Sequence, residues 1–145
     1  MVDALREAHR VLDSRGVVAD LRPERDPGNR RRRYIRAEVH WDGRRTPVGA
    51  IGESTEYISD YIASDRAVAR ILREGLFWLE RTELFWLRTY FRDLQTVDRY
   101  LAVEWTGTVV PQTMRRSLLR TLARHPRARI VAADLFRLNV LRKGT

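Results

Sequence analysis

The alternation of apolar and polar positions divides the chain into helical and extended segments. Over residues 2–12, apolar side chains recur at steps of three and four, which predicts a helix with one buried face. Gly16 can end that helix, and the uninterrupted apolar residues 17–19 are typical of a strand covered on both faces. We expect Asp20 to end the strand and Pro23 to prevent further pairing.

A β-hairpin is predicted over residues 34–53. Its first arm alternates apolar and polar residues, and Asp42-Gly43 is a strong signal for a tight turn. Pro47 confines the returning arm to the edge of a sheet. His40 falls on the polar face of the first arm.

The remainder of the chain alternates helices and strands in the same way. Apolar stripes predict helices that begin near residues 54, 93 and 111. One strand is predicted within residues 76–91 and one or two strands within residues 129–142. Bulky groups on both sides of the first imply cover on both of its faces. Together these elements predict an α/β fold with a small mixed sheet and helices on both faces.

The first twenty residues resemble one step of class I S-adenosylmethionine-dependent methyltransferases. In that family a helix reading roughly Leu-x-Glu-x-x-Arg-Val-Leu runs through a Pro-Gly-Gly turn into a buried strand that ends in an acid. The matching positions here are Leu5, Glu7, Arg10, Val11, Leu12, Gly16, residues 17–19 and Asp20. Ser14 and Arg15 stand where the family usually has Pro and the first Gly.

In that family the matching step is the fourth helix and fifth strand, beyond the midpoint of the domain. The later elements resemble its closing half, in which an antiparallel seventh strand lies between the fifth and the sixth. The resemblance therefore implies one partial, Rossmann-like domain over residues 1–145, with the hairpin at residues 34–53 as an insert. It implies a substrate-side half that is not catalytically competent alone.

The glycine-rich cofactor loop of the family has no counterpart in the sequence. We therefore expect the isolated chain to bind no cofactor, although S-adenosylmethionine serves the complete family domain. No catalytic or cofactor-binding residue is assigned. The strand at residues 17–19 would lack its usual neighbour, so the resemblance implies a homo-oligomer or a complex with a complementary N-terminal half.

Composition narrows the remaining possibilities. The 145 residues suffice for one domain, and no apolar run approaches the length of a membrane span. The chain has no Cys and its three His are widely spaced, so we expect no disulfide, no metal site and a cytoplasmic location. The net charge is +9, almost all of it from Arg, which favours a generic solvated basic surface.

Candidate site residues are few. Asp20 and Arg22 follow the first strand, where ligands of open α/β sheets gather, and His40 is a possible substrate contact. A capping or ion-pairing role for Asp20 and a solvated position for His40 are the structural alternatives. Four consecutive arginines form the strongest candidate for a polyanion, and a surface loop is the alternative; they are Arg30, Arg31, Arg32 and Arg33.

Three functional hypotheses follow from the sequence. The first is the methyltransferase piece, completed by a chain or segment that carries the glycine loop. The second is a basic nucleic-acid-binding module that uses Arg30 to Arg33, with weak and non-specific binding as the expectation. The third is a protein-interaction module that uses an exposed sheet edge.

Overall fold

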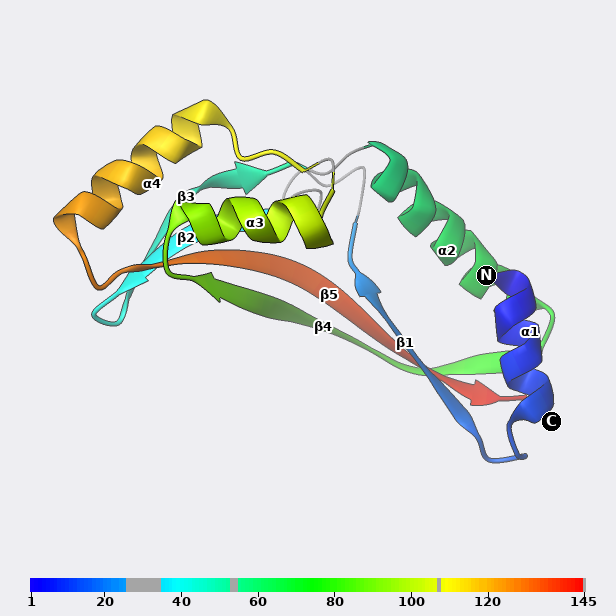
Figure 1. Ribbon diagram of the computed structural model, residues 1–145. Coiled ribbons are helices and arrows are strands. Elements are labelled where there is room, and N and C mark those ends of the chain that lie inside the picture. The colour runs from blue at the N-terminus through cyan, green and yellow to red at the C-terminus, as the bar shows by residue number, and fades with distance from the viewer. Residues whose placement is uncertain (26–34, 53–54, 107, 145) are drawn as a thin grey trace. The chain divides into compact units, whose positions relative to one another are not determined.

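A computed structural model of the chain describes residues 1–25, 35–52, 55–106 and 108–144 (Figure 1). Within these ranges it contains four helices and five strands. In chain order they are α1 (Val2–Val11), β1 (Val17–Pro23), β2 (Ile35–Trp41), β3 (Arg44–Ile51), α2 (Thr55–Arg73), β4 (Phe77–Phe91), α3 (Leu94–Glu104), α4 (Gln112–Arg124) and β5 (Arg129–Lys143). The predicted α/β content is confirmed.

The strands form a sheet with the order β1-β5-β2-β3, and β4 also pairs with β5. The pairing of β1 with β5 is antiparallel, from Val17 opposite Arg142 to Pro23 opposite Phe136. The pairings of β2 with β3 and with β5 are also antiparallel. We expected a mixed sheet, but no parallel register occurs among the described residues.

The chain divides into two compact units. Unit 1 contains Met1–Arg25, Glu56–Phe85 and Phe136–Thr145, and unit 2 contains Asp26–Thr55 and Trp86–Leu135. The two long strands β4 and β5 contribute to both units. The expectation of a single domain stays a prediction, and each unit is described by itself below.

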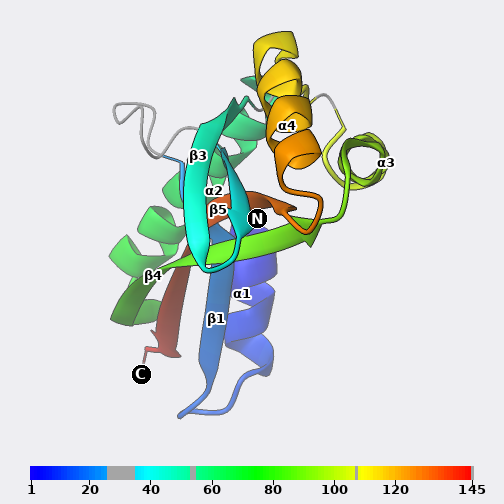
Figure 2. The ribbon, with the colours of Figure 1, turned by 90° about the vertical axis from the view of Figure 1, so that its left-hand side faces the viewer.

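In unit 1, α1 and α2 pack on the same face of the strands. Their buried residues form one cluster with β4 and β5, namely Leu5, Val68, Ile71, Phe77 and Leu141, and Val18 of β1 packs against it. Helix α2 ends in a Schellman-type turn, in which the amide of Leu76 donates to the carbonyl of Ile71 and Gly75 adopts φ 73°. Figure 2 shows α1 and α2 alongside β1 and β5.

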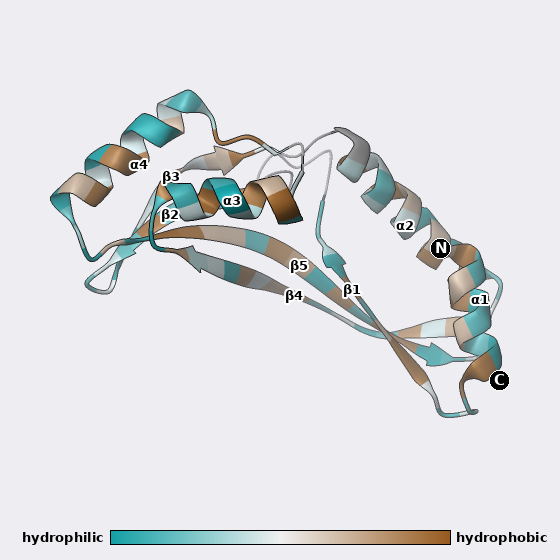
Figure 3. Ribbon diagram, viewed as in Figure 1, coloured by the Kyte–Doolittle hydropathy of each residue, from teal (hydrophilic) through white to brown (hydrophobic). Residues whose placement is uncertain are grey.

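The opposite face of unit 1 carries no helix in the described part of the chain. Val17 is 45% exposed and Leu21 is 53% exposed, and Trp78 of β4 is half exposed. Arg142, which pairs with Val17, lies over the Trp78 ring, so these side chains share one face. We call this surface the open face; Figure 3 shows the hydrophobic positions along its strands. The prediction that β1 and β4 are covered on both faces is therefore wrong, whereas helices on both faces of the sheet stay a prediction.

Unit 2 is built on the predicted hairpin. Asp42 and Gly43 have φ of 45° and 75°, the left-handed conformations of its tight turn, and a β-bulge occurs beside Pro47. Helices α3 and α4 bury one face of β2, β3 and β5. The fully buried centre of that core is formed by Ile35, Val39, Leu118 and Ile130.

Two local details differ from the sequence expectations. Strand β1 does not end at Asp20 but continues to Pro23, which pairs with Phe136. Among the described residues β1 has a partner strand on one side only, so Pro23 is tolerated because its missing N–H interrupts no second ladder. No helix within the described ranges has both the length and the apolar character needed to cross a membrane.

Candidate functional site

The polar face of β1 in unit 1 holds a nearly buried charge network. Asp20 and Arg22 alternate with apolar residues along the strand, so both side chains lie on the face that α2 covers. The Arg22 Nε and an Asp20 carboxylate oxygen are 2.8 Å apart, and the two side chains are 13% and 9% exposed. Arg22 also reaches Asp65 of α2 through its Nη1, at 3.1 Å.

Arg137 of β5 extends the network. Its guanidinium pairs with Asp65 and lies 3.3 Å from Glu24, whose side chain is only 11% exposed. Asp65 is therefore shared by two arginines that come from different strands. Each of the three carboxylates thus has at least one guanidinium partner, which offsets part of the cost of burying its charge.

Asn139 joins this network to β4. Its Nδ2 donates to Asp20 Oδ2 over 3.0 Å, and its Oδ1 accepts from the Thr82 hydroxyl over 2.9 Å. Asn139 is 6% exposed, so both halves of its amide are satisfied by side chains rather than by solvent. One buried amide thus connects β1, β5 and β4.

A cavity of about 310 Å³ opens onto this network. Its polar lining comes from Arg22, Asp65, Thr82, Arg137 and Asn139, and its apolar lining from Val68, Ala69, Leu72 and Leu79. Thr82 supplies the only hydroxyl among these lining residues. Such a site can hold and orient a small polar group by hydrogen bonds and charge. An incoming anion would have to compete with carboxylates for both guanidinium groups.

The structure separates the three predicted substrate residues into two sets. Asp20 and Arg22 are brought together as an ion pair. Ion pairing is the structural role that the sequence offered for Asp20 as the alternative to binding a substrate. His40 belongs to unit 2, where its Nε2 lies 2.7 Å from Glu38 and its ring meets Tyr90 edge to face. His40 is 15% exposed, so the expectation of a fully solvated side chain is wrong. A substrate role for any of them stays a prediction.

The other predicted cluster, Arg30 to Arg33, lies outside the described residues. Sequence reasoning missed Asp65, Arg137 and Asn139. Arg137 and Asn139 occupy alternate positions between apolar residues of β5, and this spacing could have indicated a polar stripe on one face. Nothing in the sequence indicated Asp65, because an acid on a helix is usually solvated.

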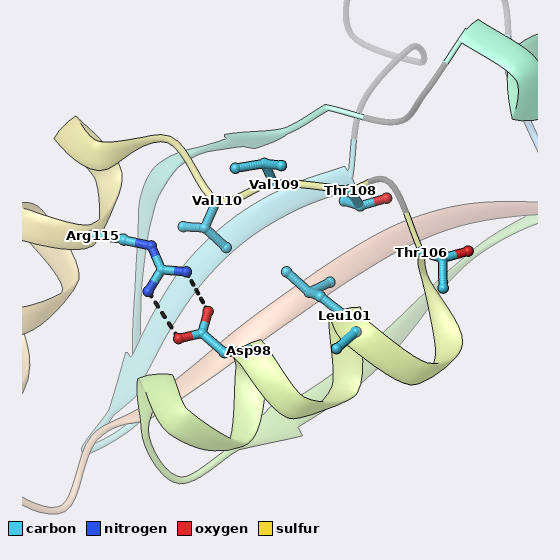
Figure 4. A pocket seen from close by; sticks show the side chains of 8 residues that line it. Asp98, Leu101, Thr106, Thr108, Val109, Val110 and Arg115 are labelled. Atoms are coloured by element: carbon cyan, nitrogen blue, oxygen red, sulfur yellow. Dashed lines mark hydrogen bonds and ion pairs between the residues drawn. The ribbon is translucent and has the colours of Figure 1, made fainter.

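A second pocket, of about 320 Å³, lies in unit 2 (Figure 4). Asp98 of α3 and Arg115 of α4 face each other across it with two parallel contacts, the Arg115 Nη1 donating over 2.9 Å. The Asp98 carboxylate accepts from the charged guanidinium and so raises the pKa of Arg115. The rest of the lining is largely aliphatic, from Leu101, Ala102, Val109 and Val110. Asp98 and Arg115 therefore join α3 to α4.

No cluster of metal-binding side chains is found among the residues that the structure describes. Comparison of the chain with models of known protein families, with curated proteins and with solved structures finds no match.

Proposed function

We propose that the chain is the substrate-side half of a class I methyltransferase-like domain. It acts only when a further segment or chain supplies the cofactor loop. On this proposal the chain itself holds the methyl acceptor, and the transfer is catalysed mainly by positioning the two reactants. A cytoplasmic location, compatible with the absence of Cys, is part of the proposal.

One observation supports the proposal most directly: β5 pairs with both β1 and β4, and its pairing with β1 is antiparallel. The resemblance equates β1, β4 and β5 with the fifth, sixth and seventh strands of the family. The resemblance therefore requires β5 to lie between β1 and β4 and to run antiparallel to both. The Asn139 amide, which bonds to Asp20 on one side and Thr82 on the other, supports the same strand order.

One edge of β1 supports the proposal that another segment or chain completes the domain. Within the described residues β1 has β5 as its only partner, so one side of its backbone has no strand beside it. In the family, the fourth strand occupies that side. The open face offers Val17, Leu21 and Trp78 to solvent, as expected of a surface that another part covers.

The cavity beside Arg22 and Asn139 is the acceptor site on this proposal. Its two arginines and one amide can hydrogen-bond the oxygen atoms of a polar acceptor, while Val68 and Leu72 contact its apolar part. Asp20 acts as a positioning residue because it holds Arg22 and Asn139 in place.

Calorimetry and an extended polypeptide test the proposal together. Titration of the isolated chain with S-adenosylmethionine up to millimolar concentration is expected to give no saturable heat. The DNA immediately upstream should encode a strand followed by a Gly-x-Gly turn, and the polypeptide that includes it should bind the cofactor with one-to-one stoichiometry. Micromolar binding by the isolated chain, or no binding by the longer polypeptide, would contradict the proposal.

A further inference from the structure

The positive charge of the chain is concentrated in unit 2. That unit contains sixteen arginines and eight acidic residues, whereas unit 1 contains twelve basic and eleven acidic residues. Nearly all of the net charge of +9 therefore belongs to one unit. Between Glu104 and Asp134 the sequence has six arginines and no acidic residue. Basic residues make up a similar share of each unit, 12 of 65 and 16 of 80, so the difference in net charge comes from the smaller number of acidic residues in unit 2.

The two units also differ in how their arginines are paired. Most arginines of unit 1 reach a carboxylate, namely Arg6, Arg10, Arg22, Arg70, Arg81, Arg137 and Arg142. Among the described arginines of unit 2, only Arg92 and Arg115 do so. Unit 2 therefore presents arginines that no carboxylate of the described residues neutralises.

Three of these arginines form a row along one side of α4. Arg116, Arg120 and Arg124 are four residues apart, so they follow one side of the helix at intervals of about 6 Å. All three are exposed, and no carboxylate of the described chain pairs with them. We call this row the α4 arginine stripe. A hollow of about 590 Å³ runs beside it, lined by Thr113, Arg116, Leu119 and Arg120.

The stripe is unfavourable for the helix by itself. Like charges four residues apart repel, and the first turn of α4 has no acidic residue to offset them. The opposite side of α4 is fixed, because Met114 and Leu118 are buried in the unit 2 core. A Cβ added at Gly49 of β3 would lie 3.2 Å from the sulfur of Met114, so helix and strand are in close contact. The arginines therefore project from a rigid support.

We propose that the α4 arginine stripe binds the phosphate backbone of a nucleic acid. A row of regularly spaced guanidinium groups matches a polymer of regularly spaced phosphates, and each Arg can donate two parallel hydrogen bonds to one phosphate. An anionic membrane fits less well. Helices that bind membranes insert an apolar face, and the apolar face of α4 is occupied by the protein core. This inference is independent of the methyltransferase proposal.

The stripe differs from the Arg30 to Arg33 cluster that the sequence indicated. Asp98 neutralises the neighbouring Arg115, so that arginine is excluded from the proposed contact. Phosphate contacts of this kind hold the backbone without reading base sequence. The expected binding is consequently non-specific and strongly dependent on salt.

Fluorescence anisotropy with a labelled 20-base-pair DNA and the matching single strand tests the inference. The test variant is Arg116→Gln/Arg120→Gln/Arg124→Gln. Its control is Arg15→Gln/Arg66→Gln/Arg73→Gln, which removes the same charge from exposed arginines of unit 1 that pair with no carboxylate in the described chain. Each phosphate contact contributes about 0.9 to the logarithmic salt slope on duplex DNA, so the test variant should lower the slope by roughly 2.7.

Between 50 and 200 mM salt these three contacts account for an affinity loss of about 40-fold in the wild type. The affinity of the test variant should therefore fall less over the same range, by that factor. The control should keep the wild-type slope, and circular dichroism should show both variants folded. Three results would overturn the inference. They are equal losses in the two variants, no saturable binding by the wild type at 50 mM salt, and equally strong stripe-dependent binding to anionic vesicles.

Discussion

Thr82 and Asn139 face each other across the junction of β4 and β5, where the threonine hydroxyl donates to the asparagine Oδ1 over 2.9 Å. The other end of the same amide donates to Asp20 of β1. A buried amide of this kind stabilises one strand order against others, because any slip in register would leave its donor or acceptor without a partner. The strand order is also the observation on which the methyltransferase proposal mainly depends.

Asn139→Leu should destabilise the protein by about 1–3 kcal/mol. The substitution keeps the volume of the side chain but leaves Asp20 and Thr82 each without one partner. Urea unfolding followed by circular dichroism measures the change. Thr82→Val is the matched control, since it removes one bond and keeps the bond to Asp20, and its effect should be smaller. Equal stability of Asn139→Leu and the wild type would show that the amide does not hold the strands together.

Gly75→Ala should destabilise α2 and the strand that follows it. Gly75 has φ 73°, and a non-glycine residue in that region loses about 1–2 kcal/mol. A Cβ there would meet nothing within 4 Å, so backbone conformation alone is responsible. Gly52→Ala is the control: it also has open space but no positive φ, and it should be neutral or slightly stabilising. Thermal unfolding compares the two, and a neutral Gly75→Ala would contradict the left-handed helix end.

The N-cap of α3 should make stability depend on pH. The backbone amide and the hydroxyl of Thr96 donate to Asp93, and these bonds lower the pKa of the Asp93 carboxyl below its ordinary value of 3.8. The stabilisation is therefore complete above that ordinary value and is lost as pH falls through the lowered one. Asp93→Asn keeps a cap oxygen but cannot titrate there, so its stability should fall less steeply below about pH 4.

Urea unfolding at a series of acidic pH values measures this difference. Asp60→Asn is a suitable control, because Asp60 is exposed on α2 and bonds to no other side chain in the described chain. It should leave the pH profile as in the wild type. If Asp93→Asn and Asp60→Asn behave alike, the cap does not contribute to the acid sensitivity.

Local sequence signals predicted the elements well, because each depended on nearby residues. The hairpin turn at Asp42-Gly43 and the N-terminal helix occur where periodicity placed them, and the last segment, predicted as one or two strands, is the single strand β5. The expected cover on both faces of β1 and β4 was wrong, because an apolar run shows that a strand is hydrophobic but not which partner buries it. Val17 and Leu21 illustrate this, since both are exposed.

The candidate site was only half predictable. Asp20 and Arg22 were found because the apolar run before them predicted a strand end there, although β1 continues to Pro23, and because their contact is local in sequence. Asp65 and Arg137 come from distant positions, and only the packing of α2 against β5 brings them to the same network. No property of Asp65 alone distinguishes it from a solvated helix acid. Contacts of this kind require the fold to be known first.

The exposed edge of β1 leads to a prediction about self-association. A strand with an unpaired edge and apolar side chains is a template for pairing with another strand. In the absence of a complementary half, the isolated chain should therefore form a dimer through β1. Leu21→Lys should prevent this, because it places a charge on the edge strand. Leu21 is exposed and contributes to neither buried cluster, so the variant should keep the stability of the monomer.

Val103→Lys provides the control, since Val103 is an exposed residue of α3 in unit 2 and the substitution makes the same chemical change. Sedimentation velocity over a concentration series should show dimers for the wild type and Val103→Lys, and monomers for Leu21→Lys. A wild type that stays monomeric at every concentration would mean that the β1 edge does not recruit a second copy. Dimers that persist in Leu21→Lys would place the interface elsewhere. Either result would remove the free edge as an argument that the domain is completed from outside.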